Sequence, residues 1–224
     1  MTIWLSAAIA GALFLGWYGS AQEPAAESPR FSVQVTLELH RNGTWLVIDP
    51  RSVLKTGDEI RFRFRTSAAG FLRVLNVSSD GRVAWLFPLG EEGSARVLPE
   101  SNYEVPAHEA SFIVAGIPGF DTTYWFVSST GRDIPANRAV DAPHANTLAP
   151  RCHEGLLKSR GVCLDERAGP RPIPKEEPLP RAVSGSGRLY SRGIEMQNAG
   201  DAVNIWTERP HPGVLAYEFR IAHR

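Results

Sequence analysis

Two cysteines, Cys152 and Cys163, are the residues of this sequence best placed to do chemistry, and they are its only cysteines. Outside the cytoplasm such a pair oxidises to a disulfide, and closing so short a loop contributes about 3 kcal/mol in the chain-entropy model. A metal site is an alternative, with His153 beside the two thiolates and Asp165 or His144 as a further ligand. The spacing matches no usual zinc template. Free thiols are the third possibility, and we expect the disulfide.

The other residue types that do chemistry form no recognisable catalytic or metal-binding motif. The six histidines are His40, His108, His144, His153, His211 and His223. No two of them are spaced i, i+2 or i, i+4, so the sequence contains no local pair of metal ligands. No serine lies in a G-x-S-x-G elbow, and no phosphate-binding glycine loop is present. The sequence therefore predicts no catalytic residue, no metal ligand and no cofactor. A fold could still bring carboxylates together for glycoside hydrolysis.

Aromatic residues are the better candidates for binding. Five of them fall in or beside predicted strands: Trp45, Trp85, Phe87, Trp125 and Trp206. Tryptophan and tyrosine dominate binding hot spots, but these side chains could equally fill a core. Strict alternation in Trp85-Leu86-Phe87 places the middle residue on the face opposite its neighbours. The strand is then buried on both faces, or it carries a covered patch that points to a partner.

Alternation of apolar and polar residues predicts the elements that would position these side chains. Residues 31–39 alternate strictly, and Asn42-Gly43 after them is a strong hairpin signal. Residues 59–66 alternate again, with three arginines on the outward face. Further apolar runs cover 71–77, 83–87, 112–115 and 123–128. About eight short strands with frequent turns predict an all-β fold, an antiparallel β-sandwich of immunoglobulin-like or similar type. No strand is followed by a long amphipathic helix, so the sequence does not favour a parallel α/β sheet.

The later part of the chain has a different composition. We expect the sandwich core over residues 31–130, an irregular Pro-rich insertion with the cysteine pair over 131–200, and C-terminal strands that complete the sandwich over 201–224. Within the insertion, Glu154 to Arg160 could form two helical turns, and residues 168–187 read as an extended connection. The last strand alternates over 214–222 and is expected to return to the first sheet, because alone it cannot bury its apolar face.

The first residues predict export. Residues 3–17 are uncharged, and the small residues Gly19 and Ala21 fit the spacing that signal peptidase accepts. No lysine or arginine precedes this run. Residues 1–21 are therefore a signal peptide or an N-terminal anchor, with a buried core helix as the remaining alternative, and 22–30 are a flexible leader. This predicts a periplasmic or extracellular location, with membrane contact only through residues 1–21 if they are not cleaved.

Charge composition bears on the class of partner. Lysine plus arginine and aspartate plus glutamate both number 24, so the formal net charge is zero. Nucleic-acid binding rests on basic patches, which this balance does not favour. We expect a protein partner in the cell envelope and no nucleic acid.

Several turn and core motifs point to a family. They are Lys55-Thr56-Gly57-Asp58-Glu59-Ile60, Gly70-Phe71-Leu72, Asp80-Gly81, Leu86-Phe87-Pro88 and Tyr103-Glu104-Val105-Pro106. In this order they resemble a bacterial family known only as a domain of unknown function, over roughly Val35 to Ser129. The resemblance implies a β-rich accessory or sensing module, exported or attached to envelope and signalling proteins such as serine/threonine kinases and caspase-like peptidases. That family offers no catalytic residues to carry over.

Together these observations predict a non-catalytic exported binding or interaction module of the bacterial envelope. An envelope hydrolase acting on peptide or glycan is the first alternative. It requires a concave pocket that holds two or more Asp, Glu or His side chains within hydrogen-bond reach. A structural tether acting through the Pro-rich segment is the second.

Overall fold

The computed structural model describes residues 31–88, 95–107, 110–131, 134–135, 148–173, 189–190, 194–199, 202–207 and 213–224. The predicted signal peptide or anchor (residues 1–21) and the predicted leader (residues 22–30) lie outside this part of the chain, as do His108, His144 and His211. Among the helices that can be described, none is long and apolar enough to cross a membrane.

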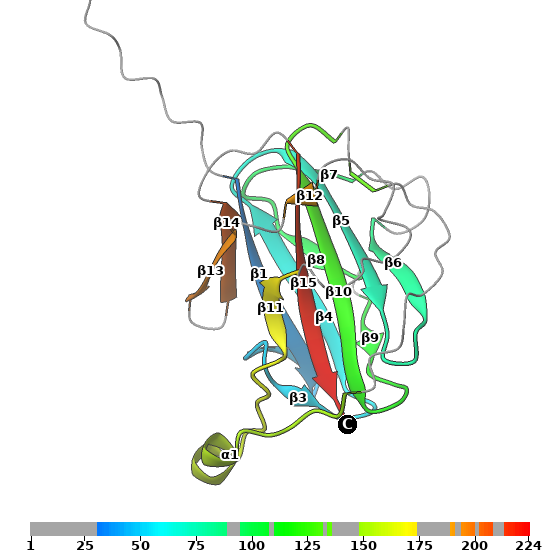
Figure 1. The fold of residues 1–224 in the computed structure, drawn as a ribbon, viewed down its shortest axis with the longest axis vertical. Coiled ribbons are helices and arrows are strands. Elements are labelled where there is room, and N and C mark those ends of the chain that lie inside the picture. Colours follow the sequence, from blue (N-terminus) through cyan, green and yellow to red (C-terminus); the bar gives the residue numbers. More distant parts are fainter. Residues whose placement is uncertain are drawn as a thin grey trace, which may run out of the picture.

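Two packed β-sheets form the body of the protein, and α1 (Glu154–Arg160) projects from one end (Figure 1). The first sheet has the order β13 (Ile194–Ala199), β14 (Ala202–Thr207), β1 (Ser32–Arg41), β4 (Glu59–Thr66), β8 (Tyr103–Val105), with β2 (Thr44–Ile48) on β1 and β9 (Phe112–Ile113) on β4. The second has the order β11 (Gly169–Pro172), β15 (Val214–His223), β10 (Gly119–Ser128), β5 (Gly70–Val77), β6 (Val83–Phe87), with β3 (Val53–Leu54) and β12 (Leu189–Tyr190) on β15 and β7 (Arg96–Val97) on β5. The predicted all-β sandwich is confirmed.

Predicted turns set the strand registers. Asn42 and Gly43 both have positive φ, 51° and 76°, which is the backbone that a two-residue hairpin with matching twist requires. They pair Arg41 with Thr44 and fix β2 against β1. Gly81, with φ of 84°, performs the same role between β5 and β6. Alternation along β1 and β4 then directs one side of each strand toward the second sheet.

Aromatic side chains dominate the core between the sheets. Trp125 on β10 is fully buried and meets Phe62 and Phe64 of the first sheet edge-to-face, with ring centroids 5.5 and 5.6 Å apart. It also stacks on Tyr217 of β15 at 5.8 Å. Edge-to-face and offset pairs of this kind add to the free energy of simple apolar burial. The core therefore joins strands from both ends of the sequence.

The two last strands close the sandwich in different sheets. β14 pairs with β1 in the first sheet, whereas β15 lies in the second sheet between β10 and β11. The sequence predicts instead that β15 returns to the first sheet. Burial explains the difference, because all ten residues of β15 are buried and only an interior strand covered on both faces achieves this.

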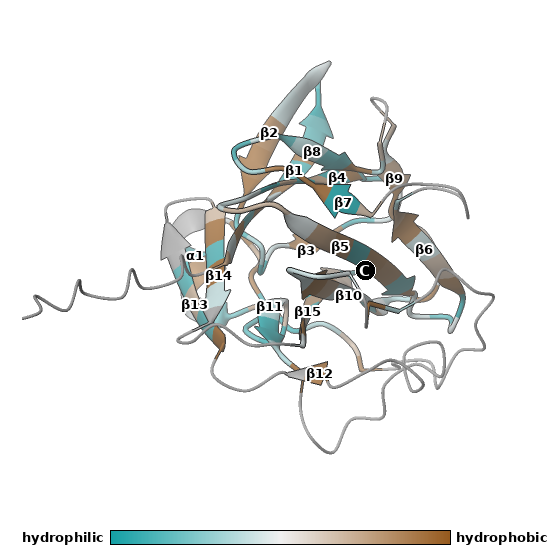
Figure 2. Cartoon of the chain, turned by 90° about the horizontal axis from the view of Figure 1, so that it is seen from above, coloured by the Kyte–Doolittle hydropathy of each residue, from teal (hydrophilic) through white to brown (hydrophobic). Residues whose placement is uncertain are grey.

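The segment expected to be an irregular insertion contributes to both sheets. Residues 169–172, predicted as part of an unpaired connection, form β11 at the edge of the second sheet. Pro170 and Pro172 are tolerated there because an edge strand need not donate every backbone hydrogen bond. Ile134, Ile173 and Leu189 pack on the outer face of this sheet, and Figure 2 shows β12 on the side of β15 that faces away from the first sheet.

A β-bulge changes the expected geometry of Trp85-Leu86-Phe87. Trp85 pairs with Leu75 and Phe87 with the adjacent Val74, so Leu86 is an extra residue in β6. Leu86 and Phe87 consequently both face the core between the sheets, and Trp85 alone packs on the outer face. Strict alternation, which the sequence predicts here, is wrong because a bulge interrupts the two-residue period.

Candidate binding cleft

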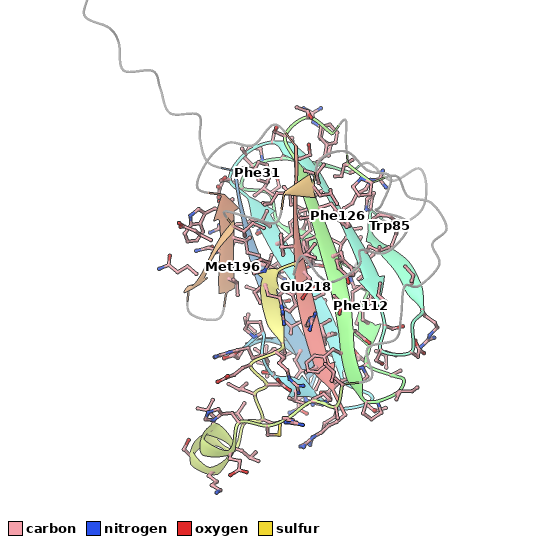
Figure 3. The ribbon with its side chains drawn as sticks, viewed as in Figure 1. Phe31, Trp85, Phe112, Phe126, Met196 and Glu218 are labelled. Atoms are coloured by element: carbon pink, nitrogen blue, oxygen red, sulfur yellow. A yellow bond between two sulfur atoms is a disulfide. The ribbon has the colours of Figure 1, made fainter. Side chains whose placement is uncertain are left out.

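A cleft of about 420 Å³ opens on one side of the sandwich, between the two sheets. It lies where β9, at the edge of the first sheet, faces β6, at the edge of the second. Figure 3 shows Phe112 of β9 and Trp85 of β6 on this same side of the molecule. β9 is only two residues long, and no described strand extends the first sheet beyond it.

Apolar side chains form most of the cleft wall: Ile60, Phe62, Leu86, Phe112, Val114 and Ile221. The bulge in β6 places Leu86 in this wall. At the rim, the side chain of Ile113 is 66% exposed. A cleft of this size with apolar walls and a few polar groups has the character of a ligand site.

The polar residues of the cleft come from β5, β10 and the turn after β5. Asn76, Ser78 and Thr123 line it together with the charged residues Arg82 and Asp121. Thr123 is engaged, since its hydroxyl donates to the carbonyl of Phe219 and accepts from the indole of Trp125.

The turn between β5 and β6 is tied by its own charges. The guanidinium of Arg82 lies 2.8 Å from the carboxylate of Asp80, and the Ser78 hydroxyl donates to the same carboxylate at 2.5 Å. The hydrogen bond from Ser78 is the main reason that the pKa of Asp80 lies below its usual value. Arg82, which lines the cleft, is therefore paired with Asp80 of the same turn.

Asp121 is the acidic residue inside the cleft, and its two oxygens differ. Oδ1 accepts a hydrogen bond from the backbone N–H of Ser79 at 2.6 Å and lies 3.4 Å from Nε2 of His223. Oδ2 has no hydrogen-bond partner among the described residues. The side chain is 19% exposed and lines the cleft, so the carboxylate combines an unused acceptor oxygen with some exposed surface.

These groups do not form a catalytic relay. The Ser79 hydroxyl donates to the carbonyl of Ile117 at 2.7 Å rather than to a histidine, and His223 is fully buried behind Asp121. A serine nucleophile needs an adjacent base to take its proton. Within the described residues, no group of three or more His, Cys, Asp or Glu side chains could hold a metal ion.

The five aromatic candidates lie away from the cleft and are not gathered into one site. Trp125 and Phe87 are buried in the core. Trp45 and Trp206 lie on the outer face of the first sheet, where the ring of Trp45 covers the guanidinium of Arg61 at 4.3 Å. Trp85 lies on the outer face of the second sheet, with its ring centroid 6.4 Å from that of Phe126.

The three outward arginines of β4 form ion pairs and hydrogen bonds across the first sheet. Arg61 and Glu38 are both nearly buried, with Nε 2.6 Å from the carboxylate. Arg63 pairs with Glu104 at 3.1 Å, and Arg65 donates to Gln34 at 2.7 Å. This face is thus a network of matched charges.

The predicted disulfide between Cys152 and Cys163 is present. Its loop is joined to the sandwich, because the N–H of Val53 donates to the carbonyl of Cys163 at 2.9 Å. The alternative metal ligands have other roles. His153 caps the N-terminus of α1, and Asp165 binds the guanidinium of Arg167 at 2.7 Å.

Asp121 and its surroundings are the functional candidates that sequence reasoning missed. One signal was available, since Asp121 stands in phase with Thr123 and Trp125 on the inward face of β10. A charged residue at an inward position of a strand indicates a site or an opening in the core. The other wall residues carry no such signal.

The fold and the cleft define a β-sandwich with a ligand-sized opening between its sheets. Residues 53–131 match the model of a family described as a domain of unknown function (DUF4384). This confirms the resemblance to such a domain, although the match begins later than Val35. No curated protein and no solved structure matches the chain. The matched segment contains nearly all the cleft residues but omits β1, β14 and β15.

Proposed function

We propose that this protein is a non-catalytic binding module, exported to the periplasm or cell surface, whose ligand site is the cleft between β6 and β9. The observation that supports this most directly is a largely apolar cleft of about 420 Å³ lined by one carboxylate, Asp121, whose Oδ2 has no hydrogen-bond partner among the described residues. Ligand pockets of roughly 300–1,000 Å³ usually combine apolar walls with a few placed polar groups.

The position of the cleft favours a protein ligand. Among the described strands, β6 pairs only with β5 and β9 only with β4, so both present an edge beside the cleft. An extended segment of a partner can add to such an edge through backbone hydrogen bonds while it inserts a side chain into an adjacent pocket. The exposed Ile113 at the rim adds apolar contact area.

The hydrolase alternative receives less support from the same geometry. Of the Asp, Glu and His side chains in the described part of the chain, Asp121 alone lines the cleft. His223, which contacts Asp121, is fully buried and is not among the residues that line the opening. General acid–base catalysis needs a group within reach of the substrate proton.

Site-specific photo-crosslinking in the native bacterium tests the proposal. A photo-reactive amino acid at Ile113 should give a defined crosslinked product, and one at Leu46, which is also exposed but lies on β2, should not. Ala84→Trp fills the mouth of the cleft and should abolish the product, because Ala84 is an exposed residue of its lining. Ala69→Trp, at an exposed turn away from the cleft, is the matched control.

Two outcomes would contradict the proposal. The first is equal crosslinking from both positions, which indicates unspecific contact. The second is a product that persists in the Ala84→Trp protein. Mass spectrometry of the mature N-terminus from the same cells tests export, since an intact cytoplasmic chain would contradict that part of the proposal.

A further inference from the structure

We infer that the group bound in the cleft is a lysine side chain of a protein partner, with its ammonium on Asp121 and its methylene stem along the apolar wall. This rests on the proposed function and specifies its ligand. The inference starts from the carboxylate of Asp121, which lines the cleft and has one oxygen engaged and one without a hydrogen-bond partner among the described residues.

Charge is the first argument. A carboxylate oxygen between apolar walls gains most from a charge-assisted hydrogen bond, and leaving it without a donor is costly. The protein's own cation at the cleft does not serve this purpose, because Arg82 pairs with Asp80 at 2.8 Å and its side chain is 74% exposed. His223 contacts Oδ1 at a long 3.4 Å and leaves Oδ2 open.

The geometry of the carboxylate distinguishes lysine from arginine. A guanidinium binds a carboxylate best through two parallel hydrogen bonds, one to each oxygen. Here Oδ1 already accepts the N–H of Ser79 at 2.6 Å, so the fork of an arginine cannot take both oxygens without displacing it. An ammonium is a compact charge that needs only Oδ2, and its remaining N–H donors can face Asn76 and Ser78, which also line the cleft.

The walls fit the rest of the side chain. Ile60, Leu86 and Phe112 give an apolar surface beside the charged group. Lysine buries its four-carbon stem along such surfaces while its charge meets a polar partner. An anionic side chain would meet Asp121 with like charge, and a purely apolar side chain would bury the carboxylate oxygen without a hydrogen bond.

The test compares three small probes of one chain length, namely n-pentylammonium, 1-pentanol and pentanoate. Each is titrated into the ¹⁵N-labelled protein, and backbone amide shifts of cleft residues give its dissociation constant. We expect the ammonium to bind about ten-fold more tightly than the alcohol, as one charge-assisted hydrogen bond implies, and pentanoate to bind most weakly. Nα-acetyl-lysine methylamide should bind more tightly than its arginine counterpart.

Variants assign the preference to Asp121. Asp121→Asn keeps an oxygen to accept from Ser79 and should reduce the preference for ammonium over alcohol to less than two-fold. Asp49→Asn, which removes a carboxylate paired with Arg51 outside the cleft, should leave it unchanged. If Asp121→Asn does not fold, the wild-type ranking of the three probes still decides.

Failure of this inference and failure of the proposed function give different results. An alcohol that binds as tightly as the ammonium, or a preference that survives Asp121→Asn, overturns the lysine assignment and leaves the cleft as a binding site. If none of the three probes shifts a cleft amide, and the Ala84→Trp protein gives the same crosslinked product as wild type, both the lysine assignment and the proposed function are overturned.

Discussion

A fully buried glutamate on the outer face of the second sheet provides a sharp test of how the insertion is attached. Glu218 on β15 lies 2.8 Å from the guanidinium of Arg220 and 3.0 Å from that of Arg171 on β11. Figure 3 shows it near the middle of β15. Substitution Glu218→Gln removes the negative charge and keeps the size of the side chain, so it isolates the electrostatic contribution.

The magnitude follows from the burial of the three groups. Glu218 is 0% exposed and Arg220 is 8% exposed, so Glu218→Gln takes the carboxylate charge away from a buried guanidinium that lies 2.8 Å from it. Breaking a buried ion pair in this way costs about 3–5 kcal/mol. Arg171 is 36% exposed and can turn to water, so we take the lower end and expect about 3 kcal/mol.

Urea denaturation followed by tryptophan fluorescence measures this cost, because Trp125 lies in the core. The midpoint should fall with an unchanged m-value if the loss is one of stability alone. Glu154→Gln is the matched control. Glu154 is 87% exposed and pairs with Lys158 at 3.7 Å, so its loss should cost less than about 0.5 kcal/mol.

Hydrogen exchange separates global from local loss. Amides of β11 should exchange faster in the Glu218→Gln protein, since Arg171 joins that strand to β15. A midpoint within 0.5 kcal/mol of wild type together with unchanged exchange in residues 169–172 would show that the buried charges do not hold the insertion to the sheet.

Three further predictions concern single side chains. Tyr217→Phe should be neutral or stabilising by up to about 1 kcal/mol in urea denaturation, because the hydroxyl is buried without a partner among the described groups. Burial also raises the pKa of Tyr217. Above about pH 10 the unfolded chain loses the phenolic proton while the folded protein keeps it, so the free energy of unfolding of wild type should fall at alkaline pH more steeply than that of the variant. Equal pH profiles would contradict this. Replacing Cys152 and Cys163 with serine should lower the free energy of unfolding by about 3 kcal/mol, whereas no change on reduction would show that the loop lies outside the cooperative unit. Burial alone would raise the pKa of Asp165, but hydrogen bonds from Arg167 and from backbone N–H groups outweigh it and lower that pKa, so the stability it contributes is present above about pH 4 and lost on acidification. Asp165→Asn should flatten that acid dependence, and an unchanged acid titration would refute it.

Local sequence patterns predicted the strands whose neighbours along the chain determine them. The hairpin at Asn42-Gly43 and the alternation of β1 and β4 depend on turn chemistry and on the two-residue period, and both are readable from the sequence. The short helix α1 was likewise predicted over its full length.

Features that depend on distant pairing or on one inserted residue were not readable. The place of β15 in the second sheet depends on its pairing with β10, about a hundred residues away in sequence, and β11 depends on β15. The bulge at Leu86 breaks the period although β6 itself contains no glycine or proline. The cleft lies where β6 and β9 form the edges of opposing sheets, so apart from Asp121 its lining residues carry no signal of their own.

The split closure of the sandwich has a consequence for biosynthesis. Trp206 pairs with Ser32, and the ten buried residues of β15 follow only at 214–223. Contacts of such high sequence separation form slowly, and a nascent chain that lacks them exposes unpaired strand edges to solvent. The first sheet is incomplete until residues 202–207 have emerged from the ribosome, and the second until residues 214–223 have emerged. A nascent chain therefore exposes unpaired edges of β10 and β11 until β15 is available, and loss of residues 214–223 removes a strand from the interior of the second sheet.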